Sequence, residues 1–463
     1  MIARRVATIA IATLLVAAQT FAGGPLQVTG PAAATPGQPF VWNVTTPIHY
    51  TVDTGPLSVN PSGQTVITNA QGLTRVQNLF NNWSAVPTSS IQYAYGGPIT
   101  GVTGGDVKTI QDFNTVSGSC NAGTQSPVIF DANGSITQAL GLDPLVIGFA
   151  SGCKLDTTGG HILSAMIVLN GEFQDGVTNV NNMNYEISTD QFDEAITHEM
   201  GHFSGLGHSQ INLDLYQSAT PGSCDVDRLA GLPLMFPVEF CQSRKSAGLP
   251  ILAPDDAAWI SKLYPNSTFA ANYGTISGFV FFSDGITHAQ GLNVIARRVD
   301  DPNTPQNESH RIAVSVVSGY SFTGNPGQSV SGDNTGGSAF GSRNPALIGY
   351  YEIPVPPGTY TVQTELIDNA FTGGSSLGPL DPPVVTNGTP ESWHHFESAF
   401  DQSNQADTVT VQAGQKISNI NIILNGTPPR FDQFEDGEVQ LLLPNDTFVF
   451  RPSPSPWEWG VNS

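Results

Sequence analysis

Eleven residues near the middle of the chain constrain its fold more than any other segment. They read HEMGHFSGLGH and run from His198 to His208. Residues i and i+4 of a helix lie on one face, so a helix would place the imidazoles of His198 and His202 side by side. Gly205 can adopt the left-handed conformation that ends a helix, and the chain can then turn to bring His208 to the same point. The segment therefore predicts a helix, a turn and three convergent imidazoles.

Three convergent imidazoles indicate a metal site of the catalytic kind. Three nitrogen ligands leave the fourth position of a tetrahedral zinc ion open to water. Zinc lowers the pKa of such a water toward ~7 and polarises a substrate carbonyl. Glu199, next to the first histidine, is placed to accept the proton of the water and to pass it to a leaving amine. We expect His198, His202 and His208 to bind Zn²⁺, and Glu199 to be the general base of peptide-bond hydrolysis.

The residues before the histidines favour the same helix independently. Ser188 and Gln191 have the spacing of a capping box, which marks the start of a helix. Apolar residues then recur at helical spacing along one face: Phe192, Ile196, Met200 and Phe203.

The N-terminus predicts export from the cytoplasm. Arg4 and Arg5 precede an apolar run over 6–18, and small residues follow at 20–22, so residues 1–22 have the pattern of a signal peptide. A retained membrane anchor is the alternative, but the run has 13 residues, against about 20 needed to cross a bilayer. We expect a secreted protein, extracellular or periplasmic, without stable membrane insertion once the signal is removed.

Cysteine usage agrees with an oxidising compartment. The four cysteines are Cys120, Cys153, Cys224 and Cys241, an even number. Three pairings are possible, and we expect Cys120 with Cys153 and Cys224 with Cys241, because each of these pairs closes a local loop. A cysteine-bound metal is the alternative, although the chain has no CxxC spacing.

The charge of the chain argues against a nucleic-acid partner. There are 38 acidic residues against 16 Lys and Arg, for a net charge of −22. Phosphate backbones and anionic membrane surfaces are bound by clustered cations, which this sequence lacks. The 49 glycines and 34 prolines favour many short strands and turns over long helices.

The order of predicted elements indicates two domains. Residues 23–40 are rich in Gly, Pro, Ala and Thr and are expected to form a flexible lead-in. Residues 41–265 mix strands with three main helices in an α+β domain: strands over 48–52, 91–95, 128–130, 145–150 and 162–169, and helices over 73–83, 188–205 and 255–264. Residues 272–426 show strands alone and are predicted to form an all-β sandwich, with the last strand over 409–424. The tail over 427–463 has no assigned role.

The sequence HEMGHFSGLGHS resembles the extended zinc motif of the metzincin metallopeptidases, and Ser209 after the third histidine is most similar to the matrixin branch. Leu234-Met235-Phe236-Pro237 is similar to the methionine turn of that family, which places Met235 beneath the metal. Pro254-Asp255-Asp256 resembles the start of the closing helix of matrixin catalytic domains. The resemblance covers about residues 41–265. It implies a metzincin-like mixed five-stranded sheet with three main helices, and protein or peptide substrates.

The resemblance also implies an edge strand that pairs with an extended substrate. We expect this edge within 162–169, at Ile162, Leu163, Ser164, Ala165 and Met166. Matrixins often bind calcium, so a Ca²⁺ site at Asp131 and Asn133 is one interpretation of that segment. A simple turn is the other.

Three features depart from the family pattern. The interval from His208 to Met235 is 27 residues, longer than is usual in the family, and it contains Cys224. No cysteine precedes Cys120, so the propeptide thiol that silences many matrixins is missing. Pro237 stands where some metzincin branches have a tyrosine that helps to hold the oxyanion.

The strand-rich part has a resemblance of its own. The segments GTISG at 274–278, GLNV at 291–294 and PPGTY at 356–360 resemble the carboxypeptidase regulatory-like, transthyretin-like sandwich. Such modules act as spacers or binding accessories. His394 and His395 lie in a polar insertion of this part, and we expect them to be exposed.

Two functions of different kinds are compatible with these residues. One is a secreted zinc endopeptidase, acting on many proteins or on a single target. The other is a non-enzymatic extracellular binding or surface protein whose fold is stabilised by the metal. Glu199 discriminates between them, because a purely structural zinc site needs no general base.

Overall fold

The computed structural model describes residues 23–177, 186–218, 223–289, 291–323, 340–365, 367, 390–402, 404–426, 430–433 and 439–442. These residues form mixed α/β structure, with ten α-helices and five sheets, which agrees with the α+β class expected from the sequence. The expected signal peptide over 1–22 lies outside the described residues. Among the described residues, no helix combines the length and the apolar character that crossing a membrane requires.

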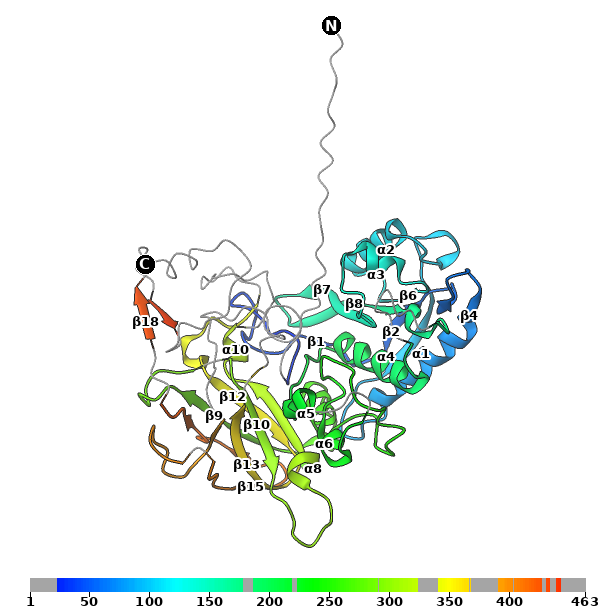
Figure 1. Cartoon of the computed structure of the whole chain (residues 1–463). Helices are drawn as coiled ribbons and strands as arrows, with labels where there is room; N and C mark the ends of the chain where they lie inside the picture. Colours follow the sequence, from blue (N-terminus) through cyan, green and yellow to red (C-terminus); the bar gives the residue numbers. More distant parts are fainter. Residues whose placement is uncertain are drawn as a thin grey trace.

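The first half of the chain is built around a six-stranded sheet (Figure 1). Its main path runs β5-β2-β6-β8, and β7 pairs with the outer side of β8. All pairs are parallel except β7 with β8. The sixth strand, β1, pairs with the first residues of β8 and adds to the five strands that were expected. The strands are β1 (Val41–Trp42), β2 (Ile48–Val52), β5 (Tyr93–Pro98), β6 (Pro127–Asp131), β7 (Gly148–Asp156) and β8 (His161–Asn170), and β3 (Ser58–Val59) with β4 (Thr65–Ile67) forms a separate two-stranded sheet.

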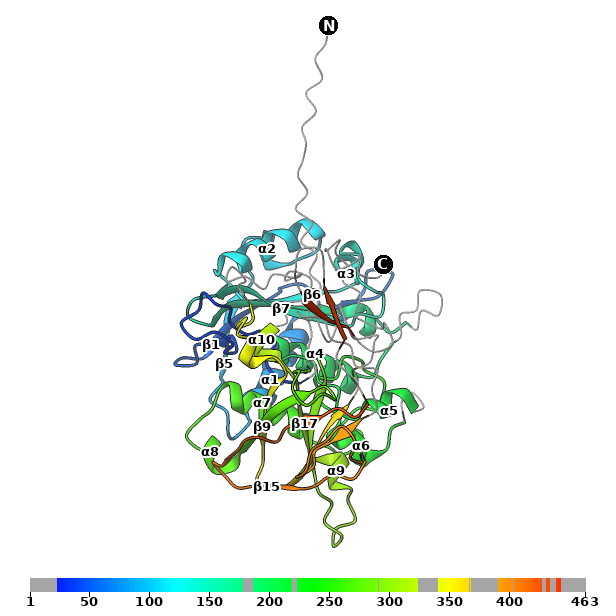
Figure 2. The ribbon, with the colours of Figure 1, turned by 90° about the vertical axis from the view of Figure 1, so that its left-hand side faces the viewer.

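Helices cover both faces of the six-stranded sheet. The helices α1 (Asn69–Ser84) and α4 (Thr189–Phe203) lie on one face, and α2 (Ile110–Ala122) lies on the other with the short α3 (Ser135–Ala139) (Figures 1 and 2). Alternate residues of β6 follow this division, since Val128 and Phe130 pack with α1 and α4 whereas Ile129 packs with α2. Strands buried on both faces read as continuous apolar runs, which is why β6 and β8 were recognisable from the sequence.

The three predicted main helices are present. Ser188 and Gln191 form the expected capping box at the start of α4. The first predicted helix is α1, and the third is α7 (Pro254–Leu263), which begins at its proline. Shorter helices lie between and after them: α5 (Leu213–Ser218), α6 (Val226–Gly231), α8 (Phe269–Asn272), α9 (Glu308–Arg311) and α10 (Tyr320–Thr323).

The strand-rich part forms two further sheets. One has the order β11-β10-β13-β14 with β15 beside β13, and the other has the order β12-β9-β16 with β17 beside β9. The strand expected over 409–424 is divided into three, because Gly414 and Asn419 take left-handed backbone conformations with φ of 69° and 65°. The strands are β9 (Gly274–Phe281), β10 (Asn293–Arg298), β11 (Ala313–Val317), β12 (Tyr350–Val355), β13 (Gly358–Glu365), β14 (Glu391–Ser392), β15 (Val409–Val411), β16 (Lys416–Ile417) and β17 (Ile422–Ile423), and in the unassigned tail β18 (Arg430–Gln433) pairs with β19 (Val439–Leu442).

The two parts of the chain share one hydrophobic core. A single cluster of buried side chains runs from Phe40 in the first part to Leu424 in the second. Trp259 of α7 lies at the junction, where its indole Nε1 donates a hydrogen bond to the carbonyl of Ser315 on β11 at 2.7 Å. The strand-rich part is therefore packed against the helix that closes the first part.

Candidate metal centre

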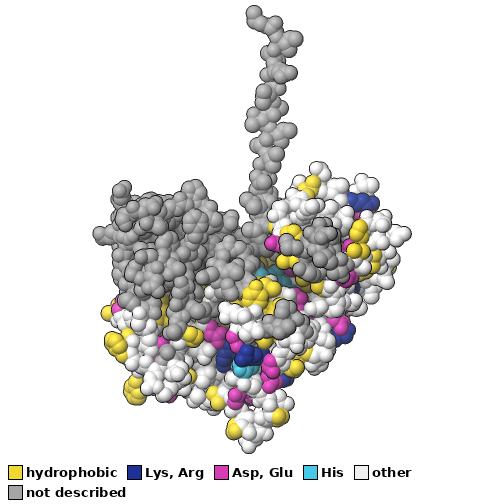
Figure 3. Space-filling view, viewed as in Figure 1, with side chains coloured by type: hydrophobic (Ala, Val, Ile, Leu, Met, Phe, Trp, Pro, Cys, Tyr) yellow, Lys and Arg dark blue, Asp and Glu magenta, His cyan; other side chains and the backbone are white. Residues whose placement is uncertain are grey.

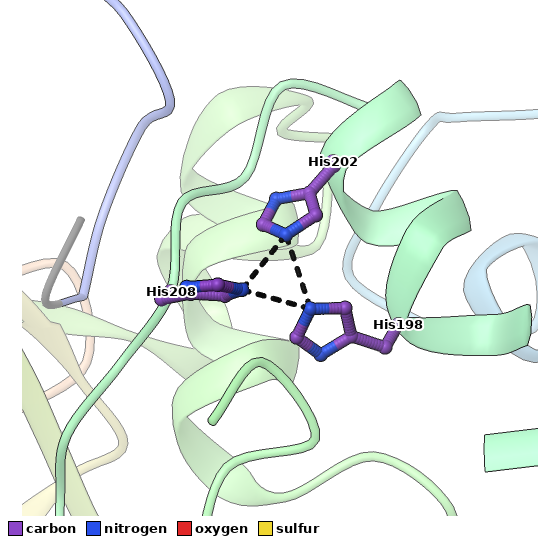
Figure 4. A group of neighbouring side chains, drawn as sticks. All are labelled: His198, His202 and His208. Atoms are coloured by element: carbon purple, nitrogen blue, oxygen red, sulfur yellow. Dashed lines mark hydrogen bonds between the residues drawn. The ribbon is translucent and has the colours of Figure 1, made fainter. Parts of the chain in front are cut away.

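The structure brings the three predicted histidines together at one point (Figure 4). His198 and His202 extend from the last turns of α4, and His208 comes from the loop after it. The Nε2 atoms of His198 and His202 are 3.0 Å apart, those of His198 and His208 are 2.9 Å apart, and those of His202 and His208 are 3.0 Å apart. The helix-turn-loop arrangement predicted from the spacing is confirmed.

In His198 and His202, a hydrogen bond at Nδ1 fixes the direction in which Nε2 points. The Nδ1 of His198 donates to the carbonyl of Leu234 at 2.7 Å, and the Nδ1 of His202 donates to the carbonyl of Leu206 at 2.8 Å. A carbonyl only accepts, so each Nδ1 carries the proton of a neutral imidazole and each Nε2 presents a lone pair. Lone pairs this close repel one another unless a cation lies between them. A tetrahedral zinc ion with bonds of ~2.0 Å separates its ligands by about 3.3 Å, so the three nitrogens fit such an ion with a small outward adjustment.

Burial keeps the histidines neutral. His202 is 4% exposed and His208 is 6% exposed. Burial lowers the pKa of His198 to about 4, and burial together with the neighbouring His198 lowers the pKa of His202 to about 3. The pKa of His208 is likewise well below its usual value, first because of burial. Neutral imidazole is the form that binds metal, so the rings can act as ligands over the whole physiological pH range.

The end of α4 is held by residues far away in the sequence. The indole of Trp42 donates to the carbonyl of Phe203 at 2.7 Å, and the hydroxyl of Tyr264 donates to the carbonyl of Ser204 at 2.6 Å. Gly205 follows with φ of 90°, as the predicted helix stop requires. These bonds satisfy carbonyls that a helix end would otherwise leave unpaired, so the turn towards His208 has a fixed direction.

The segment expected to be a flexible lead-in supports the ligand loop instead. The amide of Leu26 donates to the carbonyl of Gly205 at 2.7 Å, and the amide of Gly207 donates to the carbonyl of Gly24 at 3.0 Å. The amide of Gly23 donates to the carbonyl of His208. Residues 23–26 thus pack against this loop, where the glycines allow the backbone to approach closely, and flexibility over 23–40 stays a prediction. Sequence reasoning missed this support, since main-chain pairing leaves no side-chain signal.

Met235 packs against α4, the helix that carries His198 and His202. It is 2% exposed, and a Cβ placed on Gly201 of α4 would lie only 2.3 Å from its sulfur. The Asp256 carboxylate accepts hydrogen bonds from the amides of Leu234 and Met235 at 2.8 and 3.1 Å. Because Leu234 also accepts from His198, Asp256 holds the turn that orients a ligand. The sequence indicated Asp256 only as part of a helix start, not in this positioning role.

Glu199 differs from the other buried carboxylates around the site. It is 8% exposed, and its Oε2 has no hydrogen-bond partner among the described residues. Burial raises the pKa of Glu199 to about 8. A buried polar atom without a partner destabilises a fold by about 1–3 kcal/mol, so such atoms are rare away from functional sites.

The edge of the sheet is β7, not the predicted segment of β8. Ile162, Leu163, Ser164, Ala165 and Met166 lie in β8, which has β7 along one side and β1 and β6 along parts of the other, so β8 is an interior strand. The prediction took the more apolar of two neighbouring runs for the edge. Apolar strands of mixed sheets are interior strands, whereas an edge strand is partly exposed along its length, as β7 is.

The start of β7 lies beside Glu199. A Cβ placed on Gly148, the first residue of β7, would lie 3.1 Å from the Cγ of Glu199. The edge strand therefore begins next to the side chain of Glu199.

Both predicted disulfides are present. Cys120 with Cys153 joins α2 to the edge strand β7, and Cys224 with Cys241 closes the chain around the methionine turn. The long interval between His208 and Met235 contains α5 and α6. Its apolar side chains Leu213, Leu215, Leu229 and Leu232 form a small cluster around the second disulfide, together with Phe236.

Asp131 acts as a turn residue. Its carboxylate accepts hydrogen bonds from the amides of Ile136 and Thr137 at 3.1 and 2.7 Å, at the start of α3. Asn133 accepts from the amide of Ser135 at 3.3 Å in the same turn. These bonds favour the simple-turn interpretation over the calcium site.

Comparison of the chain with known protein families, with curated proteins and with solved structures finds no match. What the protein does is therefore inferred from its own residues.

Proposed function

We propose that this protein is a secreted zinc-dependent endopeptidase of the metzincin type, with a matrixin-like catalytic part. His198, His202 and His208 would hold Zn²⁺, and Glu199 would be the general base. The observation that carries this proposal is the convergence of three Nε2 lone pairs beside a buried carboxyl oxygen that has no hydrogen-bond partner among the described residues. A structural metal site explains the histidines but gives no reason for Glu199.

The chemistry divides between the ion and the chain. The ion, when bound, makes a water more acidic and polarises the scissile carbonyl. A nearby cation also favours the ionised form of a carboxyl group, so Glu199 would be a carboxylate in the zinc form and could accept a proton at Oε2. The same oxygen would return that proton to the nitrogen of the leaving amine. Asp256 and the Leu234 carbonyl would keep the His198 ring in the orientation that this transfer needs.

The position of β7 supports protein or peptide substrates. An extended peptide can pair with the free side of an edge strand through its main chain. Because β7 begins at Gly148, beside Glu199, a peptide lying along it would pass the carboxyl group and the histidines. The face drawn in Figure 3 has Lys and Arg in a few small groups, most of them beside Asp or Glu, which gives no support to a nucleic-acid partner.

Other features support the metzincin assignment and secretion. The order β5-β2-β6-β8-β7, with one antiparallel edge strand, agrees with the mixed five-stranded sheet that the resemblance implied, and Met235 packs against the metal-binding helix. Two disulfides support an oxidising compartment. The paired sheets of residues 274–426 support the proposal of a carboxypeptidase regulatory-like module after the catalytic part.

The test combines metal analysis with cleavage of a diverse peptide library by the mature chain, with and without chelator. Glu199→Gln should keep one zinc ion on the three histidines and lose about 10²–10⁴-fold in turnover, because only the proton acceptor is removed. His202→Ala should lose this zinc as well as activity. Glu194→Gln is the matched control, since Glu194 is another buried glutamate of α4 and should leave turnover unchanged.

Two results would count against the proposal. If Glu199→Gln cleaves as fast as the parent, Glu199 has no part in the mechanism. If the zinc-loaded parent cleaves no peptide in the library, the non-enzymatic interpretation is favoured.

A further inference from the structure

We propose that the strand-rich part carries a second metal site, in which Glu391, His394 and Asp401 bind a divalent transition-metal ion. This site does not depend on the proposed peptidase activity. It would cross-link β14 to the loop that follows it.

The three side chains converge. One ligand atom from each of Glu391, His394 and Asp401 lies within 4.8 Å of the others. Glu391 is at the start of β14 and only 1% exposed, and His394 and Asp401 are partly buried. From the sequence we expect both His394 and His395 to be exposed, and the structure confirms this only for His395.

The surrounding residues fix the three ligands in place. The Nε2 of His394 donates to the carbonyl of Gln402 at 3.0 Å, so its Nδ1 presents the lone pair. Asn425 donates from Nδ2 to the carbonyl and to a carboxylate oxygen of Asp401, at 3.0 and 2.9 Å. The backbone amide of Asn425 also donates to Glu391 at 3.3 Å. A histidine whose outer nitrogen binds a backbone carbonyl, with carboxylates that are themselves hydrogen-bonded, is the usual surrounding of a protein metal ligand.

The charges of this region call for a cation. Glu397 lies beside the group, where its carboxylate accepts hydrogen bonds from the amides of His394 and Ile423. In the described part of the chain, no Lys or Arg forms an ion pair with Glu391, Glu397 or Asp401. A bound divalent ion would offset the negative charge of these carboxylates.

The donor set selects the kind of ion. Calcium and magnesium take oxygen ligands, whereas imidazole together with carboxylates suits zinc and its neighbours in the first transition row. We therefore use Zn²⁺ as the probe. The loop that the ion would fix also carries Phe396 and Phe400, which are 92% and 96% exposed, so the site would hold two apolar side chains at the surface.

The experiment counts zinc ions bound to the full mature chain after equilibration with Zn²⁺ and removal of free metal. The parent should bind two, and His394→Ala should bind one. His395→Ala is the matched control and should bind two, because His395 is the exposed neighbour whose Nδ1 pairs with Asp407 at 2.9 Å. His202→Ala should bind one, and the double variant His202→Ala with His394→Ala should bind none.

This design separates the two sites. A parent that binds a single zinc ion, lost in His202→Ala and kept in His394→Ala, would overturn the second site and leave the first intact. Binding of Ca²⁺ but not Zn²⁺ in the His202→Ala chain would also overturn the proposal, because the histidine would then not be a ligand. If His394→Ala does not fold, Asp401→Asn replaces it with a side chain of the same shape and should likewise bind one ion.

Discussion

Gly201 offers the sharpest test of how the methionine turn supports the metal ligands. It lies in α4 between His198 and His202. Replacing a mid-helix glycine by alanine normally stabilises a helix by about 1 kcal/mol, because alanine loses less conformational entropy on folding. At Gly201 we expect the opposite. The new Cβ would lie 2.3 Å from the Met235 sulfur and 2.9 Å from the Cζ2 of Trp83.

The size of the effect follows from these distances. Carbon atoms in ordinary contact are about 3.5–4.0 Å apart, so the sulfur must move by more than ~1 Å. Trp83 cannot move freely, because it is fully buried and its indole donates to the carbonyl of Thr197 at 2.9 Å. Overpacking a core costs about 1–3 kcal/mol. After subtraction of the helix gain of about 1 kcal/mol, Gly201→Ala should lower the free energy of unfolding by up to about 2 kcal/mol.

The same clash should weaken metal binding. Leu234 accepts from His198, and the carbonyl of Met235 accepts from the amide of Ser209 at 2.8 Å, next to His208. A displaced methionine turn therefore misplaces two of the three ligands. Loss of such supporting contacts weakens metal affinity by about 10–100-fold.

The assay pairs urea unfolding with zinc competition against a chelator. The control is Gly118→Ala in α2, where a Cβ would meet no atom within 4 Å. That variant should gain about 0.5–1 kcal/mol and bind zinc as the parent does. If Gly201→Ala is as stable as the parent and keeps its zinc affinity, the close packing of α4 on Met235 is refuted.

Two further predictions concern stability. Replacing Cys224 and Cys241 by alanine should lower the free energy of unfolding by about 3 kcal/mol, because the disulfide closes a loop of 17 residues. With a reductant present, parent and variant should have the same free energy of unfolding, and a remaining difference would contradict this. Burial raises the pKa of Glu194, which is 3% exposed, to about 7 from its ordinary 4.5. The protonated Glu194 side chain therefore makes its full contribution to the free energy of unfolding below about pH 4.5. That contribution, roughly 3 kcal/mol, is lost as the pH rises through 7 and the group ionises in the folded protein. In Glu194→Gln the free energy of unfolding should decrease less between pH 5 and pH 8 than in the parent. If urea titrations show the same decrease in both proteins, the raised pKa of Glu194 is contradicted.

The ligand helix was predictable because its signals are local. The four-residue spacing of His198 and His202, the cap at Ser188 and the stop at Gly205 act within one helix and need no information from the rest of the chain. The helix α2 carried a similar signal, since Phe113, Val116 and Cys120 recur at helical spacing and are all buried. That helix could have been found by the same reasoning.

The edge strand was not predictable in the same way. Whether β7 or β8 is the outer strand depends on which strands pair, and those partners lie up to about 120 residues apart, as Val41 and His161 do. The packing of residues 23–26 was not predictable for a related reason. Gly23 contacts His208 only through main-chain atoms. A Cβ at Gly23 would lie 2.3 Å from the Ser315 carbonyl oxygen, so glycine there marks a close contact and not a loose chain.

The shared core changes how the strand-rich part should be understood. The sequence suggested an accessory module, yet Ser315 of β11 donates its amide to Asp255 at 2.8 Å and accepts from Trp259, both on α7. The next residue of α7, Asp256, holds the turn whose Leu234 carbonyl orients His198. Contacts therefore run without a break from β11 through α7 to His198. A spacer could be removed without effect on the first part, whereas removing residues 272–426 would expose Trp259 and release the helix that fixes the methionine turn. The arrangement of the three histidines thus depends on both parts of the chain, and we expect a truncated first part to bind zinc more weakly than the full chain.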